Sequence, residues 1–453
     1  MSSLNKVFKK IFDVNKVRII DSDIYCDEKG QDHLKIEVSL HKSVSNRCPV
    51  CHKKCQGYDT PGYKRKWRHL DLGGIISEIE MDAHRIKCKK HGVLCEAVPF
   101  AYKGSEFTKD FDLTASFFAR SVSKSFVSEY MRISWQSVGR CISRARSDLD
   151  PDLSRRLDNL VNIGIDETSI AKGYKYITVI VNHDTNEVVW LHKNHGKEIL
   201  KLFFEQLSKD QRDSIKAVSG DGAKWIDECL EEYIPKATRC CDAYHTVTWL
   251  QEALDDVRAE AWHIANDKVK QINKKYPKGR PAKDDREREP IKEAKEYSKA
   301  IKNSRYALGK NPDHLTSYQE TKLEMIAESE PKLFKAYRLK EDLRIILHLK
   351  DVLAAETFLD EWLWKASHSR IKPFVEVSRK IRRHKKHILN TIEYGLSNAR
   401  IEAVNNNIKL IIRRAYGFRN LDNMFDMIYL ICSNIEIPLP NRAKKPISET
   451  ASE

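Results

Sequence analysis

The chain has 453 residues, room for about three domains of ~150 residues each. Its formal net charge of +15 favours a polyanionic partner, either nucleic acid or an anionic membrane surface. No apolar run approaches the ~20 residues of a membrane-spanning helix, so we expect no membrane partner. Of its 11 cysteines, several cluster between residues 48 and 95, which indicates metal binding in a reducing compartment rather than a disulfide scaffold. We therefore expect a cytoplasmic protein that works on nucleic acid.

The N-terminal third contains two pairs of metal-ligating residues. "RCPVCHKKC" and "KCKKHGVLC" each place two ligand residues three positions apart, a spacing suited to tetrahedral zinc. The residues between them alternate like a hairpin, which would bring the pairs together. We predict a structural zinc ion, because four protein ligands leave no open position for chemistry. The predicted ligands are Cys48, Cys51, Cys88 and His91. Three neighbours are rival ligands: Cys55, Cys95 and His52. The alternative is a small β-domain with incidental cysteines.

A group of short helices is expected next. Residues 111–120 and 124–131 have helical patterns, and Ser134 is suited to cap a third helix. That helix has Trp135, Val138 and Ile142 at helical spacing, with arginines on another face. The layout predicts a helix-turn-helix whose second helix enters the DNA major groove, with a plain helical spacer as the alternative. The residues expected to contact DNA are Gln136, Ser137, Arg140 and Arg144.

Two aspartates follow strand-like runs in the middle of the chain. In "NLVNIGIDET" the apolar residues alternate up to Ile165, so we predict a strand that ends at Asp166, with Glu167 as its solvated neighbour. Residues 174–192 read as two strands joined by a turn, and a helix follows. A short strand at 215–218 then ends in Ser-Gly-Asp221-Gly, where the glycines allow close backbone approach.

A third carboxylate lies on a predicted helix in "SNARIEAVNNNIKLIIRRAYGFRN". Glu402, Asn406, Lys409 and Arg413 share one face of this helix, opposite an apolar side. Taken alone, such a glutamate is more often simply exposed to solvent. The order of strand, hairpin, helix, strand and late helix matches a ribonuclease-H-like sheet, in which the three carboxylates converge. There Asp166, Asp221 and Glu402 would bind two divalent ions, Mg²⁺ or Mn²⁺, for phosphoryl transfer.

Several longer motifs resemble one bacterial family. "CPVC", "ISWQSVGRCI", "IGIDETSIAKGYKYITVI", "VSGDGAKWI", "CDAYHTVTWLQEALDDVR" and the block beginning "SNARIEAVNNNIKL" are similar to ISL3-type insertion-sequence transposases. These enzymes have an N-terminal zinc-binding domain and a DDE catalytic core. The resemblance implies that Asp166, Asp221 and Glu402 are the catalytic triad. It also implies that His245, which shares a motif with Asp242, lies near the scissile phosphate.

The expected fold is multidomain α+β, with a zinc-binding N-terminal β domain (residues 1–100) and a helix-turn-helix (101–150). A ribonuclease-H-like α/β catalytic core (158–250) is closed by residues 390–436, which carry Glu402. A large helical insertion (251–389) interrupts this core, and a disordered tail (437–453) follows it. "SRKIRRHKKH", residues 378–387, is either a solvated helix face or a grip on DNA phosphates. The further expected DNA contacts are Arg382, Arg383, Lys385, Lys386, Lys409 and Arg413.

The function expected from these features is that of a DNA transposase. It would bind the terminal inverted repeats of its insertion sequence, cleave double-stranded DNA with metal ions and join the ends to target DNA. We expect a homodimer or higher assembly on paired ends, associated with the bacterial nucleoid. One alternative is a non-catalytic zinc and helix-turn-helix DNA-binding regulator derived from a transposase. Another is a nuclease without strand transfer.

Overall fold

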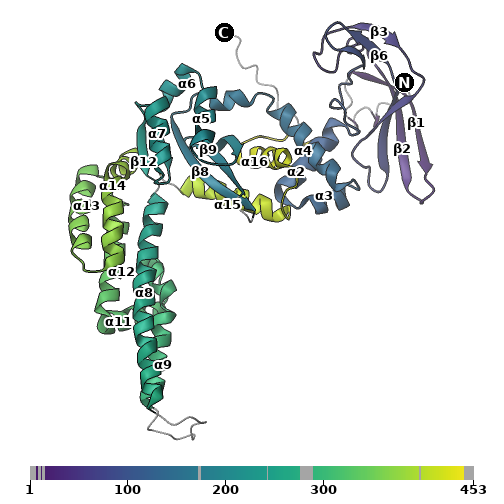
Figure 1. Cartoon of the computed structure of the whole chain (residues 1–453). Helices are drawn as coiled ribbons and strands as arrows, with labels where there is room; N and C mark the ends of the chain where they lie inside the picture. Colours follow the sequence, from purple (N-terminus) through teal and green to yellow (C-terminus); the bar gives the residue numbers. More distant parts are fainter. Residues whose placement is uncertain are drawn as a thin grey trace. The chain divides into compact units, whose positions relative to one another are not determined.

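A computed structural model of the chain describes residues 7, 8, 12, 16–171, 175–241, 243–275, 289–396 and 399–442. The described residues form helices and three β-sheets (Figure 1). The chain divides into two compact units, Met1–Arg155 with Asn406–Glu453, and Arg156–Asn405. None of the described helices combines the length and the apolar composition needed to cross a membrane. The predicted domain boundaries stay predictions. The tail predicted to be disordered spans residues 437–453, and its residues from 443 onward lie outside the described residues.

The first unit contains two small sheets. Its larger sheet buries Ile36, Trp67 and Ile79 on one side, because alternate strand residues face the same way. β4 and β5 pair antiparallel, so the hairpin-like alternation is confirmed. The four-stranded sheet has the order β1 (Val17–Cys26), β2 (Asp32–Leu40), β5 (Ile76–Asp82) and β4 (Lys64–Arg68). The three-stranded sheet has the order β3 (Gln56–Asp59), β6 (Arg85–Cys88) and β7 (Gly92–Cys95).

The helices that lie wholly in the described part of this unit are α2 (Lys109–Ser121), α3 (Lys124–Tyr130), α4 (Trp135–Leu149) and α16 (Leu421–Cys432), and the unit also contains the end of α15 (Ala399–Arg414) from Asn406 onward. The first three begin after a capping serine or threonine whose side chain accepts a main-chain N–H, as Ser134 does from Ser137. The three helices predicted here are therefore confirmed as helices. α16 packs against α4 and α2.

The second unit is built on a five-stranded sheet with the order β10-β9-β8-β11-β12. β8 pairs antiparallel with β9, and β9 with β10, whereas β8, β11 and β12 run parallel. The hairpin predicted at 174–192 is confirmed as β9 and β10. The strands are β8 (Asn162–Ala171), β9 (Lys175–Asn182), β10 (Glu187–Lys193), β11 (Ala217–Gly220) and β12 (Thr238–Cys241).

The predicted end of the strand that carries Asp166 is wrong, and the strand predicted at 215–218 lies at Ala217–Gly220. Asp166 does not end its strand, because β8 continues to Ala171 while it pairs with β9. Along its other edge β8 pairs with β11, and β11 stops at Gly220. Near Asp166, β8 therefore remains paired with β9 but is no longer paired with β11. The apolar alternation stops early because the following side chains face polar neighbours, not because the backbone leaves the sheet.

Helices cover both faces of this sheet. On one face Ile163, Ile165 and Val218 pack with apolar residues of α5 (Lys197–Gln206) and α7 (Lys224–Tyr233). Gly164 lies on the other face, where Ile401 of α15 (Ala399–Arg414) packs on it. Figure 1 shows α15 alongside β8. Alternation along β8 therefore directs odd positions to α5 and α7 and even positions to α15. A short α6 (Lys209–Ser214) precedes β11, and a 3-10 turn (Leu153–Leu157) precedes β8.

All the regular elements described between residues 251 and 389 are helices, as expected, and they bury a core around Trp362, Leu343 and Phe374 that also includes Cys241 of β12. α14 also packs against β12, which ties the insertion to the sheet. The helices are α8 (Ala243–Lys274), α9 (Glu289–Lys302), α10 (Arg305–Gly309), α11 (Ser317–Ser329), α12 (Pro331–Ile346), α13 (Val352–Ser367) and α14 (Lys372–Tyr394), with a 3-10 turn at Pro312–His314.

The packing of α15 on β8 depends on a residue without a side chain. A Cβ at position 164 would lie 2.2 Å from Ile401 Cδ1 and 2.8 Å from His183 Nε2. We expect Gly164→Ala to lower the free energy of unfolding by about 1–3 kcal/mol through overpacking. Gly309→Ala, where a Cβ meets nothing within 4 Å, is the control. Adding Ile401→Ala should make the Gly164→Ala cost smaller in denaturant titrations; simply additive costs would contradict this packing.

Candidate active site and metal centre

Asp166 lies on β8, and Asp221 directly follows the neighbouring parallel strand β11. β11 pairs with β8 as Ala217 with Asn162 and Ser219 with Gly164, so paired residues differ by 55 in number. Asp221 and Asp166 differ by the same number, which places them side by side at the carboxyl edge of β11. Ligands of open α/β sheets commonly bind at this edge.

The surroundings of Asp166 act on its charge in opposite directions. Burial raises the pKa of Asp166 above its ordinary value, and the negative charge of Asp221 adds to this shift. The Glu167 N–H donates to Oδ1 at 2.7 Å and the Asn405 amide donates to Oδ2; both lower the pKa, as does the charge of His245. His245, in the first turn of α8, therefore lies within electrostatic reach of Asp166. Asp242 lies outside the described residues.

Close backbone packing places Asp221. A Cβ on Gly220 would lie 3.2 Å from the Ile165 carbonyl oxygen, and a Cβ on Gly222 would lie 3.3 Å from His384 Nε2. The prediction that these glycines permit close approach is therefore confirmed. The Ala223 N–H donates to Asp221 Oδ1 at 3.0 Å, and the buried Arg239 guanidinium donates to the Asp221 carbonyl.

Glu402 lies in the first turn of α15 and is exposed. Ile401 packs on Gly164, and Asn405, one turn later, contacts Asp166, so the start of α15 lies beside the strand that carries Asp166. Among the described residues, one group of His, Cys, Asp or Glu side chains has at least three ligand atoms that all lie within 4.8 Å of one another. Asp166, Asp221 and Glu402 are not in this group. The structure thus brings Asp166 and Asp221 together and leaves Glu402 on the adjoining helix turn.

One residue next to the site, Glu167, differs from its predicted surroundings, whereas Asn406 lies on the exposed face of α15 as predicted. Glu167 is not simply solvated: it is half-buried, it lies 3.1 Å from His195 Nδ1 and it accepts the Gly196 N–H. Burial raises the pKa of Glu167. Asn406, placed with Glu402 on the predicted polar face, is exposed, whereas Asn405 is buried against β8. A run of three asparagines gives no signal of which one faces the sheet.

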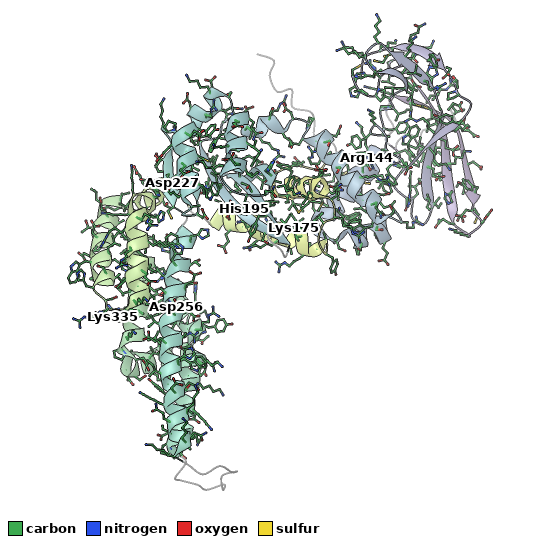
Figure 2. All side chains as sticks on the ribbon, in the orientation of Figure 1. Arg144, Lys175, His195, Asp227, Asp256 and Lys335 are labelled. Atoms are coloured by element: carbon green, nitrogen blue, oxygen red, sulfur yellow. The ribbon has the colours of Figure 1, made fainter. Side chains whose placement is uncertain are left out.

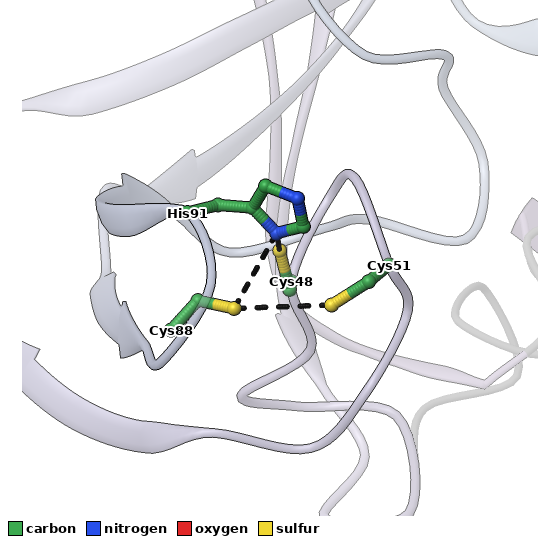
Figure 3. A group of neighbouring side chains, drawn as sticks. All are labelled: Cys48, Cys51, Cys88 and His91. Carbon is green, nitrogen blue, oxygen red and sulfur yellow. Dashed lines mark hydrogen bonds between the residues drawn. The ribbon is translucent and has the colours of Figure 1, made fainter.

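Cys48, Cys51, Cys88 and His91 form the group within 4.8 Å, in the first unit (Figure 3). His91 Nδ1 lies 3.5 Å from Cys48 Sγ and 3.5 Å from Cys88 Sγ, and Cys51 Sγ lies 3.8 Å from Cys88 Sγ. Zn–S and Zn–N bonds in a tetrahedron require edges of about 3.8 Å between sulfurs and about 3.5 Å between sulfur and nitrogen. These ligand atoms therefore fit one zinc ion.

Main-chain N–H groups favour thiolates in this cluster. The N–H groups of Lys90 and His91 point at Cys88 Sγ and lower the pKa of Cys88 to about 7. Cys55 lies beside the cluster but outside its 4.8 Å group, and the Cys95 thiol contacts the Tyr63 hydroxyl instead. His52 is exposed. The rival ligands are therefore less well placed than the predicted four.

Comparison with known proteins identifies the family. Residues 163–428 match the ISL3-type DDE transposase family, described as "Transposase". The chain is 35% identical over 443 residues to the transposase for insertion sequence element IS1557 of Mycobacterium tuberculosis, strains CDC 1551 / Oshkosh and H37Rv, covering 97% of this chain and 98% of each relative. The chain belongs to the ISL3-type family of DDE transposases. This transposase is also 24% identical over 384 residues to the transposase for insertion sequence element IS1001 of Bordetella parapertussis, covering 83% of this chain and 86% of that relative.

The predicted DNA-contacting residues of α4 differ in exposure. Gln136 and Arg140 are exposed, whereas Ser137 is buried next to the helix cap and Trp135 is 36% exposed beside Lys124. Arg144 has a structural contact instead of a free guanidinium: it donates two hydrogen bonds, 2.8 and 2.7 Å long, to Asp112, which has no exposed surface. Figure 2 labels Arg144 on α4.

The basic residues of α14 and α15 are mostly exposed. Lys385 is the exception, because it pairs with Glu356 and Asp360 of α13 at 2.9 and 2.8 Å. Between the exposed positions, Ile381 and His384 are buried, so the basic run is the outer face of an amphipathic helix. The exposed predicted residues are Arg382, Arg383, Lys386, Lys409 and Arg413.

We expect purified transposase to carry one zinc ion per chain, measurable by inductively coupled plasma mass spectrometry. Cys48→Ser, Cys51→Ser and Cys88→Ser should each lose it, because a structural zinc site needs all four ligands. Cys55→Ser and Cys95→Ser are the matched controls and should retain it. Loss of zinc from either control would contradict the assigned ligand set.

Removing Arg144 should be costly because it would leave Asp112 buried without a cation. We expect Arg144→Leu to reduce the free energy of unfolding by about 3–5 kcal/mol. Arg140→Leu, at an exposed site on the same helix, should change it by about 0.5 kcal/mol or less. Chemical denaturation of the two variants compares them. Equal stabilities would contradict a structural role for the Arg144–Asp112 pair.

Proposed function

We propose that this transposase cleaves DNA at the ends of its insertion sequence and joins those ends to target DNA, using Asp166, Asp221 and Glu402 as its catalytic carboxylates. The observation that carries the proposal is the parallel register of β8 with β11, which continues to Asp166 and to Asp221, the residue after β11, and the electrostatic effect of Asp221 on Asp166. The sheet order and strand directions agree with a ribonuclease-H-like core. The family match over residues 163–428 covers all three residues.

The chemistry of the donor set suits a hard divalent cation. Carboxylate oxygens are the ligands that Mg²⁺ and Mn²⁺ prefer, and Asp166 has one protein donor on each oxygen, which leaves a lone pair on each. Two bound ions would activate the attacking oxygen and stabilise the leaving one. The protein's own contribution is to hold the carboxylates on a rigid sheet edge. His245, whose charge reaches Asp166, would contact the scissile phosphate.

Separate exposed basic groups would hold the DNA. α4 would enter the major groove through Gln136 and Arg140, with α2 and α3 supporting it as a helix-turn-helix. Arg382, Arg383 and Lys386 of α14, with Lys409 and Arg413 of α15, would contact phosphates. The zinc ion would stabilise the N-terminal strands rather than take part in catalysis. Two ends held together require at least a homodimer.

Cleavage of DNA carrying the element's own ends tests the proposal. We expect Mg²⁺-dependent cleavage by the wild-type transposase and a loss of about a thousand-fold or more in Asp166→Asn, Asp221→Ala and Glu402→Gln, since metal stabilisation supplies several kcal/mol. Binding to the ends should stay within a few-fold. Asp213→Ala, an exposed aspartate of α6, is the control and should cleave normally.

The products decide between the remaining functions. Ends joined to target DNA support the transposase, whereas cleavage without joining would indicate a nuclease. Wild-type rates in Asp221→Ala would contradict the assigned carboxylates. Specific binding with no cleavage by the wild type, with paired ends supplied, would favour the regulator.

A further inference from the structure

A buried amide connects α15 to the strand that carries Asp166. Asn405 is 8% exposed, and Thr168, two residues after Asp166 on β8, is 3% exposed. Residues two apart on a strand face the same side, so Asp166 and Thr168 both face α15. The Thr168 hydroxyl donates to Asn405 Oδ1 at 2.9 Å, and Asn405 Nδ2 donates to Asp166 Oδ2.

The chemistry of the three groups allows one orientation of the amide. An ionised carboxylate only accepts hydrogen bonds, so the amide nitrogen has to face Asp166. The amide oxygen then faces Thr168, whose hydroxyl has to donate. Because the hydroxyl fixes the amide and the amide fixes the carboxylate oxygen, the three residues form a directional chain. The Glu167 N–H holds the second oxygen of Asp166 at 2.7 Å, so rotation of this carboxylate is restrained at both oxygens.

The same contacts set the position of α15. Ile401 packs on Gly164, and Asn405 follows one helical turn later, beside Asp166 and Thr168. Two strand residues advance by about 6–7 Å, and the four helical residues from Ile401 to Asn405 advance by about 6 Å, so the two sets of contacts match. Glu402 is three residues before Asn405 and is its neighbour on the helix surface. The amide therefore ties the helix turn that carries Glu402 to the strand that carries Asp166.

We propose that Asn405 and Thr168 are positioning residues that orient Asp166, and through α15 Glu402, for binding the divalent ions. This inference rests on the proposed role of the three carboxylates. Neither residue touches substrate in this role; each acts through Asp166. A merely structural role would give the variants lower stability and an unchanged metal affinity, which makes the two roles separable.

Mn²⁺ titration of the full-length, zinc-loaded transposase tests this inference, with free Mn²⁺ measured by electron paramagnetic resonance. Residues that orient a metal ligand typically contribute 10–100-fold to metal affinity. We expect Thr168→Val, which keeps the shape and removes the hydroxyl, to weaken Mn²⁺ binding by about tenfold or more. Asn405→Ala should do the same, while Thr168→Ser should restore affinity to within about threefold because it keeps the donor. Asn405→Ala also serves if Thr168→Val does not fold.

Two matched controls separate orientation from stability. Thr178→Val removes an equally buried hydroxyl, which donates to the Asn194 carbonyl on the opposite face of the sheet. Asn407→Ala removes an exposed amide from the same helix. Both should leave Mn²⁺ affinity unchanged, and thermal melts of every variant report stability.

The outcomes distinguish the inference from the function on which it rests. If Asp166→Ala removes Mn²⁺ binding while Thr168→Val and Asn405→Ala keep wild-type affinity, the inference is overturned and the carboxylate site stands. If Asp166→Ala binds Mn²⁺ as the wild type does, the proposed site itself fails, and the inference fails with it. Loss of affinity in both positioning variants, with rescue in Thr168→Ser, supports it.

Discussion

The parallel pairing of β8 with β11 is the constraint on which the candidate site depends. It brings residues 55 positions apart to the same level, and it ends where β11 ends, so Asp166 and Asp221 share one edge of the sheet. Close packing then fixes the surroundings of both carboxylates. Near Asp166, Gly164 leaves room for Ile401 of α15, and Gly220 and Gly222 allow the backbone around Asp221 to approach its surroundings. A change in this register would separate the two carboxylates.

The two units use different means to hold their polar residues. In the second unit, Asp166 is half-buried on a sheet with helices on both faces, where burial raises its pKa and hydrogen-bond donors oppose the shift. In the first unit, the apolar cluster beneath the three-stranded sheet contains little more than Ile86 and cysteines. So small a cluster buries little apolar surface, which agrees with four metal ligands stabilising this region.

Much of this arrangement could be predicted from local sequence. The alternation of Ile163 and Ile165, the serine cap before α4 and the spacing of Cys48 and Cys51 are short-range signals, and each predicted its local structure correctly. Arg144 and Asn405 could not be predicted in this way, because their partners Asp112 and Asp166 are 32 and 239 residues away in the chain. Periodicity gives the face of a helix but not the partner that the face will meet. The extent of β8 was missed for the same reason, since β9 sustains it.

The central claim is that Asp166, Asp221 and Glu402 together hold divalent ions. The most direct test replaces Mg²⁺ with Fe²⁺ and uses hydroxyl radicals formed at the bound iron to cut the transposase chain nearby, with the cut sites mapped by mass spectrometry. The account predicts cuts near residues 166, 221 and 402 that excess Mg²⁺ suppresses. Cuts confined to other regions, or cuts at these residues that Mg²⁺ does not suppress, would contradict it.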